Sequence, residues 1–231
     1  MPEELCARCK SPSVLYQRYS GRSLCAAHLT SDVLVRMKRS IRLDGGLGKR
    51  SVLAVVWEGC ACLCLLSLLG LIIKERPGME LVLLRYADSE YEFPNELHPI
   101  LSSVRIRTEL IGGGMIQGAA IRMGADRLIR CTTLDEAAGE VIDALLSGRC
   151  RDLLCAPDPS PLICLSPLRE IPCEELRIVA GHLNIPAPSI SNVGDTHDVL
   201  SSLVRNHPSV PFSLIRYKDR LGDLARQGRM Q

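Results

Sequence analysis

Aromatic residues are scarce in this chain, whose 231 residues include only one Trp, two Phe and five Tyr. Leu, Val, Ile and Ala must therefore fill the interior, and the 46% hydrophobic content predicts an aliphatic core. The first residues, MPEELCARCK, lack the apolar stretch of a secretory signal. We therefore expect the eleven cysteines to be reduced, intracellular thiols, some of them holding metal, and not a disulfide framework.

The charge is small overall but unevenly distributed. Residues 1–50 contain ten Lys and Arg against four Asp and Glu, whereas the remainder contains eighteen against twenty-two. This asymmetry predicts an N-terminal end that faces a polyanion, on a neutral-to-acidic body.

One long apolar stretch, Ser51–Ile73, organises the chain. We interpret it as a buried strand (Val52–Val56), a tight turn (Trp57–Cys62) and a buried helix (Leu63–Ile73). The alternative is a transmembrane helix, because basic residues flank the run on both sides. The β-branched first half and an interruption by glycine favour the strand–turn–helix interpretation, and with it a protein without a membrane span.

The turn occupies the place where a nucleotide-binding α/β fold carries its phosphate loop. Such a loop needs backbone amides freed by glycines and a nearby hydroxyl or cation. Trp57 and Glu58 oppose both requirements, and Gly59 is the only glycine of the turn. The pattern is therefore that of an enzyme scaffold that has lost its catalytic loop.

Two ligand pairs with matched spacing stand near the N-terminus. Cys6 and Cys9 are separated by two residues, as are Cys25 and His28, and fifteen residues lie between the pairs. Each pair fits one tight turn, and the two pairs together complete a tetrahedral Cys3His set with no open position. We predict a structural zinc finger over residues 1–30.

Basic and aromatic residues are interleaved around these two ligand pairs. Such a mixture favours contact with RNA, through its phosphates and its stacked bases. A solvated finger surface explains them equally well. We expect a helix over Val33–Arg42 with Asp32 as its N-cap, followed by a glycine-rich linker to residue 50. The candidate nucleic-acid-binding residues are Arg18, Arg22, Arg36, Lys38 and Arg39.

Strands alternate with helices along the rest of the chain, which predicts a doubly wound parallel sheet of the PP-loop or Rossmann type. We expect an α/β domain over residues 51–190 and a helical segment over 191–231. The further predicted strands are Met79–Tyr86, Val104–Leu110, Arg127–Cys131 and Leu162–Leu165; the further helices are Met115–Met123, Leu134–Leu146 capped by Thr132 and Thr133, Cys173–Leu183, Asp195–Asn206 and Lys218–Arg226.

This order of elements resembles the cytoplasmic tRNA 2-thiolation proteins of the PP-loop ATP pyrophosphatase superfamily. The Cys3His finger has that family's position and spacing, and VLAVVWEGCACLCLL lies where the family has a strand, an SGGxDS loop and a helix. The segments Gly124–Arg149 and Ser166–Leu176 are similar to two further family segments. The resemblance implies a tRNA substrate and a cytoplasmic location.

Departures from the family pattern fall on its catalytic parts. Only Gly59 of the SGGxDS loop remains. The family's GHN is replaced by a stretch that begins at Cys131, whereas its paired acidic residues are present as Asp135 and Glu136. Active members carry a CxxC pair and a later cysteine, yet Gly112–Arg122 and Ser189–Asn192 contain none. The resemblance therefore implies a non-catalytic partner subunit that binds tRNA and forms a heterodimer with an active PP-loop paralogue.

Two other functions stay open at this point. The first is a sulfur-transfer or redox enzyme that uses Cys131 or the triplet Cys60, Cys62 and Cys64, although such cysteines are more often small core residues. The second is a stand-alone RNA-binding zinc protein. No residue is assigned a catalytic or cofactor-binding role, and structural zinc is the expected cofactor.

Overall fold

The structure, a computed structural model, describes residues 4–58, 61–74, 76–89, 101–102, 104–112, 116–154, 161–187 and 194–228. Gly59 and Cys60 of the predicted turn lie outside these ranges, as does the stretch 189–192, where the resemblance expects a cysteine. Positions 113–115 also lie outside them.

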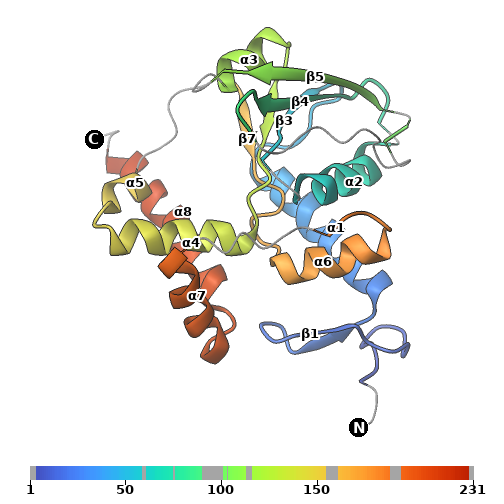
Figure 1. Cartoon of the computed structure of the whole chain (residues 1–231), viewed down its shortest axis with the longest axis vertical. Helices are drawn as coiled ribbons and strands as arrows, with labels where there is room; N and C mark the ends of the chain where they lie inside the picture. The colour runs from blue at the N-terminus through green and yellow to red at the C-terminus, as the bar shows by residue number, and fades with distance from the viewer. Residues whose placement is uncertain are drawn as a thin grey trace.

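Strands and helices alternate along the described chain in the predicted order (Figure 1). The strands are β1 (Leu15–Gln17), β2 (Arg22–Leu24), β3 (Val52–Val56), β4 (Glu80–Tyr86), β5 (Arg105–Ile111), β6 (Arg127–Ile129) and β7 (Ile163–Leu165). The helices are α1 (Ala26–Leu43), α2 (Ala61–Ile73), α3 (Ile116–Arg122), α4 (Leu134–Leu146), α5 (Cys150–Leu154), α6 (Cys173–His182), α7 (Gly194–Asn206) and α8 (Val210–Gly228).

Five strands form one parallel sheet in the order β5-β4-β3-β6-β7. Residues of β3 alternate between two cores: Leu53 and Val55 pack with residues of α1, α2 and α6, whereas Ala54 and Val56 pack with residues of α3. Helices therefore cover both faces, and the predicted α/β class is confirmed. The hairpin β1–β2 is a separate antiparallel pair at the opposite end of α1 from the sheet (Figure 1).

The long apolar stretch is divided between two elements, as predicted. Its first part is the central strand β3 and its second part is α2, which is buried on most of its surface. Among the described helices, none combines the length and the apolar character needed to cross a membrane.

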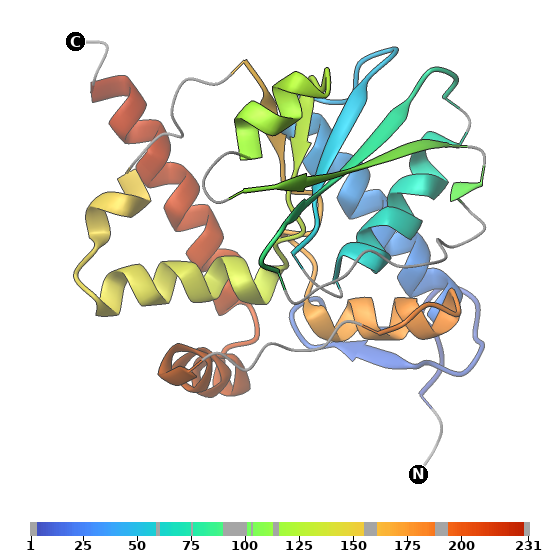
Figure 2. The same cartoon turned by 45° about the horizontal axis from the view of Figure 1, so that its top comes forward.

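Four helices, α4, α5, α7 and α8, form a group beside the sheet (Figure 2). Ala137 of α4 packs on Ile215 of α8, and Ile142 of α4 packs on Leu200 of α7. Helix α8 begins at Val210, eight residues before the predicted start at Lys218. The prediction left residues 207–217, which contain two prolines, outside both helices, but proline is tolerated in the first turn of a helix.

The prediction for the start of α1 was wrong. The helix begins at Ala26 with Cys25 as its N-cap, so the second ligand pair, Cys25 and His28, lies at the first turn of α1. Asp32 lies inside α1 and is not an N-cap. Its carboxylate forms ion pairs with Arg8, Arg22 and Arg36. The local capping pattern could not reveal these distant basic partners.

Candidate functional site

The four predicted metal ligands come together. Cys6, Cys9, Cys25 and His28 place one ligand atom each within 4.8 Å of one another. The Sγ atoms of Cys9 and Cys25 are 3.7 Å apart, and Nδ1 of His28 lies 3.3 Å from the Cys25 sulfur. Edges of about 3.3–3.8 Å are those of a tetrahedral zinc site with sulfur and nitrogen ligands. The donor set therefore fits structural zinc.

Backbone hydrogen bonds shape the turn that contains Cys6 and Cys9 and favour the thiolate form of Cys6. Lys10 adopts a left-handed backbone conformation with φ of 62° and donates its amide to the Cys6 carbonyl over 3.1 Å, which closes the turn. Burial by itself would raise the pKa of the Cys6 thiol. Backbone amide hydrogen bonds, led by that of Cys25, outweigh it and lower this pKa to about 6. Cys6 is therefore ready to bind metal as a thiolate at neutral pH.

A buried polar network joins the finger to α6. The Glu175 carboxylate accepts hydrogen bonds from Gln17 Nε2 at 3.0 Å and from the Tyr19 hydroxyl at 2.5 Å, and it forms an ion pair with Arg36. Burial raises the pKa of Tyr19 above its usual range, so the hydroxyl remains a donor. The sequence analysis did not single out Glu175, because its partners Gln17, Tyr19 and Arg36 lie 139 or more positions away along the chain.

Two predicted RNA-contact residues are used inside the protein. Arg36 lies between the carboxylates of Asp32 and Glu175 and also donates to the Glu170 carbonyl over 3.0 Å. Arg22 forms an ion pair with Asp32 at 3.3 Å. These contacts hold the finger against α1 and α6.

The other three basic candidates lie at the surface. Arg18 is exposed and donates to the carbonyl of Arg205 on α7 over 2.8 Å. Lys38 and Arg39 are exposed neighbours on α1. They are the members of the predicted set best placed to meet a polyanion.

The predicted phosphate-loop position lies where β3 ends, at the carboxyl edge of the sheet. Trp57 is 4% exposed, and its amide donates to the Leu84 carbonyl of the neighbouring strand over 2.7 Å. Glu58 follows and forms an ion pair with Arg130, just beyond β6, at 2.9 Å. Burial raises the pKa of Glu58, and the nearby Arg130 guanidinium lowers it in part. An acid–base pair thus spans the ends of two neighbouring strands.

A disulfide joins the same two segments. Cys62, in the first turn of α2, is bonded to Cys131, two residues beyond β6, and their Cα atoms are 5.5 Å apart. The expectation that these cysteines are free thiols is therefore wrong for this pair, because the parallel crossover brings together residues that are 69 positions apart. Cys64 is buried outside this bond, and its thiol donates to the Leu176 carbonyl over 3.8 Å.

The surviving acids Asp135 and Glu136 serve helix ends. The Glu136 side chain accepts from the Thr133 amide over 2.7 Å, while the Thr133 hydroxyl accepts from the Glu136 amide, which completes a capping box on α4. The Asp135 carboxylate accepts from the amide of Cys173 over 2.6 Å, at the start of α6. Capping therefore accounts for both residues.

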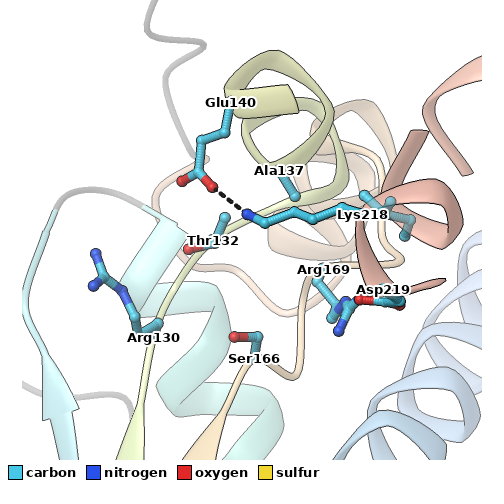
Figure 3. Close-up of a pocket in the computed structure, with 9 residues that line it drawn as sticks. Arg130, Thr132, Ala137, Glu140, Ser166, Arg169, Lys218 and Asp219 are labelled. Atoms are coloured by element: carbon cyan, nitrogen blue, oxygen red, sulfur yellow. Dashed lines mark hydrogen bonds and ion pairs between the residues drawn. The ribbon is translucent and has the colours of Figure 1, made fainter. Parts of the chain in front are cut away.

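A polar cavity of about 270 Å³ opens beside the carboxyl edge of the sheet (Figure 3). Arg130, Thr132 and Ser166 line it from the ends of β6 and β7, and α4 and α8 close it. Its lining also contains Ala137, Glu140, Arg169, Ile215, Lys218 and Asp219. Lys218 pairs with Glu140 and Arg169 with Asp219, so these charges are compensated within the cavity.

Comparison with known proteins identifies the finger. Residues 5–30 match a protein-family model described as the N-terminal LIM domain of the 2-thiouridine synthetase TtuA. A search of curated proteins found no match.

Comparison with solved structures identifies the fold. The chain is similar to the U34-tRNA thiolase NcsA from Methanococcus maripaludis, a structure with its [4Fe-4S] cluster, at a TM-score of 0.77 and 18% identity over 96% of this chain and 88% of that one. A weaker similarity, with a TM-score of 0.42 and 14% identity, covers 87% of this chain and 94% of an NH3-dependent NAD synthetase from Campylobacter jejuni. The protein thus combines a PP-loop-like α/β fold with a finger of the TtuA type.

Proposed function

We propose that this protein is a non-catalytic member of the tRNA 2-thiolation family that works in the cytoplasm. It binds tRNA and an active PP-loop paralogue, with which it forms a heterodimer. Its finger and fold support the family relationship, and the carboxyl edge of its sheet supports the loss of catalysis.

The observation that carries the proposal is the ion pair between Glu58 and Arg130. Adenylation of a uridine needs a cradle of free amides and cations for triphosphate oxygens. Here a carboxylate lies two residues beyond β3, and the nearest arginine beyond β6 is already paired with it at 2.9 Å. A triphosphate would have to break this pair and would meet a negative charge, with the buried Trp57 indole beside it.

The sulfur chemistry of active members also lacks its residues. The sequence has no cysteine between residues 112 and 122, and none after Cys173. The buried thiol of Cys173 is a poor nucleophile, because burial raises its pKa to about 11. ATP handling and sulfur handling are therefore both missing, as expected for a subunit that depends on an active partner.

RNA contact is assigned to the finger side of the molecule. Lys38 and Arg39 are exposed on α1, the helix whose first turn carries His28. A structural zinc bound by the Cys3His set would fix the finger relative to these cations. Phosphate contacts of this kind give affinity that falls with rising salt concentration.

A second function, cysteine-dependent sulfur transfer to tRNA, is favoured by one observation, the meeting of Cys62 and Cys131. Their burial opposes it, because the two side chains are 0% and 4% exposed and a tRNA base could not reach them in this conformation. Anaerobic purification followed by assay of iron, labile sulfide and thiol reactivity distinguishes the two functions, since absence of iron and labile sulfide together with unreactive thiols would exclude sulfur transfer.

The decisive experiment is deletion of the gene in its native host, followed by measurement of 2-thiouridine in bulk tRNA. We expect 2-thiouridine to be lost, and native purification to recover an intact PP-loop paralogue with this protein. Unchanged 2-thiouridine would favour the stand-alone RNA-binding zinc protein. Thiolation by the purified protein alone, with ATP and a sulfur donor, would contradict the non-catalytic assignment.

A further inference from the structure

The disulfide between Cys62 and Cys131 has a reduced form that the surrounding structure already accommodates. Both sulfur atoms lie 3.4 Å from the carbonyl oxygen of Val56, at the end of β3. A thiol on either residue could donate to this oxygen, so reduction would leave the two groups beside a hydrogen-bond acceptor. The Cα separation of 5.5 Å is in the usual range for a disulfide, so the bond could form again without backbone movement.

The two sulfurs differ in their surroundings. Cys62 lies in the first turn of the thirteen-residue helix α2, and its sulfur accepts the Glu58 amide over 3.4 Å. A helix N-terminus and a backbone donor both stabilise a thiolate. No described amide donates in the same way to the Cys131 sulfur, which lies in the loop after β6. Cys62 is therefore suited to attack, and Cys131 to resolve the product.

This bonded pair contrasts with the other described cysteines. Seven of these are not disulfide-bonded, and three of the seven contribute to the metal site, which binds metal only through reduced thiolates. A protein that depends on reduced thiols works where a disulfide does not persist unless it is cycled. The bond between Cys62 and Cys131 is therefore suited to reversible chemistry and not to a permanent cross-link.

We propose that Cys62 and Cys131 are a redox-active dithiol that is oxidised by a peroxide and reduced by a dithiol. The Cys62 thiolate attacks one peroxide oxygen, forming an S–O bond and breaking the O–O bond, and the departing oxygen takes a proton and leaves as water. The Cys131 thiol then attacks the Cys62 sulfur, forming the S–S bond and releasing a second water. The two thiols lose two electrons and the peroxide gains them.

A small dithiol reduces the disulfide between Cys62 and Cys131. One thiolate of the reductant attacks the disulfide and forms a mixed disulfide, and its second thiol closes a cyclic disulfide, so that both protein cysteines regain their protons. A peroxide is chosen as the oxidant because it is small enough for a site in which both cysteines are buried.

The oxidised state attaches the first turn of α2 covalently to the loop after β6. The disulfide and the Glu58–Arg130 ion pair connect the same two segments, but the Glu58 and Arg130 side chains are 28% and 48% exposed, and such pairs hold weakly. Reduction would remove the covalent bond between the start of α2 and the loop after β6 and would leave this weak ion pair between the two segments. The redox state would thus control how firmly the first turn of α2 is held to the loop after β6, whatever the protein does with tRNA.

The test uses the full-length, zinc-loaded protein without RNA. The protein is treated with dithiothreitol or hydrogen peroxide, alkylated under denaturing conditions and mapped by mass spectrometry. We expect a cross-linked peptide containing Cys62 and Cys131 after peroxide, its loss after dithiothreitol, and its return with a second addition of peroxide. Failure of this peptide to form, or its survival in dithiothreitol under native conditions, would overturn the proposal.

Trp57 provides a second readout, because it is the single tryptophan of the chain and precedes Glu58, whose amide contacts the Cys62 sulfur. We expect its fluorescence to change reversibly between the two states in the wild type and in the C64S control, and to be unresponsive in C62S and C131S. A change of equal size in C131S would overturn the proposal.

The assignment of the attacking sulfur is tested separately. In C131S, peroxide should leave a sulfenic acid on Cys62 that a dimedone probe captures, whereas C62S should show no such label on Cys131. Labelling of Cys131 instead of Cys62 would reverse the two roles.

Discussion

The guanidinium of Arg36 on α1 forms a buried ion pair with the carboxylate of Glu175 on α6, 139 residues further along the chain. Their side chains are 16% and 2% exposed. Gln17 and Tyr19 of the finger donate to the same carboxylate. One glutamate therefore connects the finger, the basic helix and the α/β body.

Substitution Glu175→Gln should destabilise the protein by about 3 kcal/mol, because it leaves the buried Arg36 charge without its main partner. Glu174→Gln is the matched control, since Glu174 is exposed on the adjacent position of the same helix. Urea denaturation of the two variants and the wild type measures the difference. Equal unfolding free energies for the two variants would show that the network contributes little.

The finger should bind one zinc ion per chain. Cys25→Ser should abolish binding, because it removes one corner of the tetrahedral set. The finger should then become open to trypsin at Arg18 and Arg22, since two three-residue strands cannot hold it alone. Elemental analysis and limited proteolysis measure both effects, with Cys150→Ser as the control because Cys150 is an exposed free thiol outside the site. Full zinc content in Cys25→Ser would contradict the assignment.

The double substitution K38E/R39E should weaken tRNA binding and flatten its salt dependence by about one slope unit for each lost phosphate contact. Fluorescence anisotropy at several salt concentrations measures both quantities. The control is Arg151→Glu, which reverses an exposed charge on α5, in the helical group beside the sheet. If this control weakened binding as much, the effect would be one of net charge and not of the finger side.

The protein alone should not bind ATP–Mg²⁺ in a calorimetric titration. A micromolar dissociation constant corresponds to about 8 kcal/mol and needs a working phosphate cradle. The same titration with the purified paralogue as a positive control would show that the assay detects a functional site. A micromolar constant for this chain would end the non-catalytic interpretation.

The stability of the protein should depend on pH through the Glu58 carboxyl at the carboxyl edge of the sheet. Its pKa is raised by burial, so the stabilisation from its protonated form is present below the unfolded pKa, near 4.3, and is lost as pH rises through the folded value. Glu58→Gln should therefore stabilise the protein at pH 7 relative to the wild type, and this advantage should vanish at pH 4. Thermal unfolding at the two pH values measures it. Destabilisation at pH 7 would mean that the pair with Arg130 outweighs the cost of burial.

Much of the fold follows from short-range patterns. The boundaries predicted for the strand Val52–Val56 and the helix Leu134–Leu146 are those of the structure, because an apolar run and a capping sequence are local features. The hairpin β1–β2 and the short helix α5 were not predicted, because elements of three to five residues carry too little periodicity.

The sequence by itself determined the metal ligands and the altered turn after β3. Two-residue spacing brings ligands together within a single turn, and the identities of Trp57 and Glu58 need no structure to be known. Only the tertiary structure decided that Arg36 is an internal ion-pair partner, and that Cys62 meets Cys131. Such pairings depend on which strands are neighbours and which helices pack together, and residues 69 or 139 positions apart leave no local pattern that records their contact.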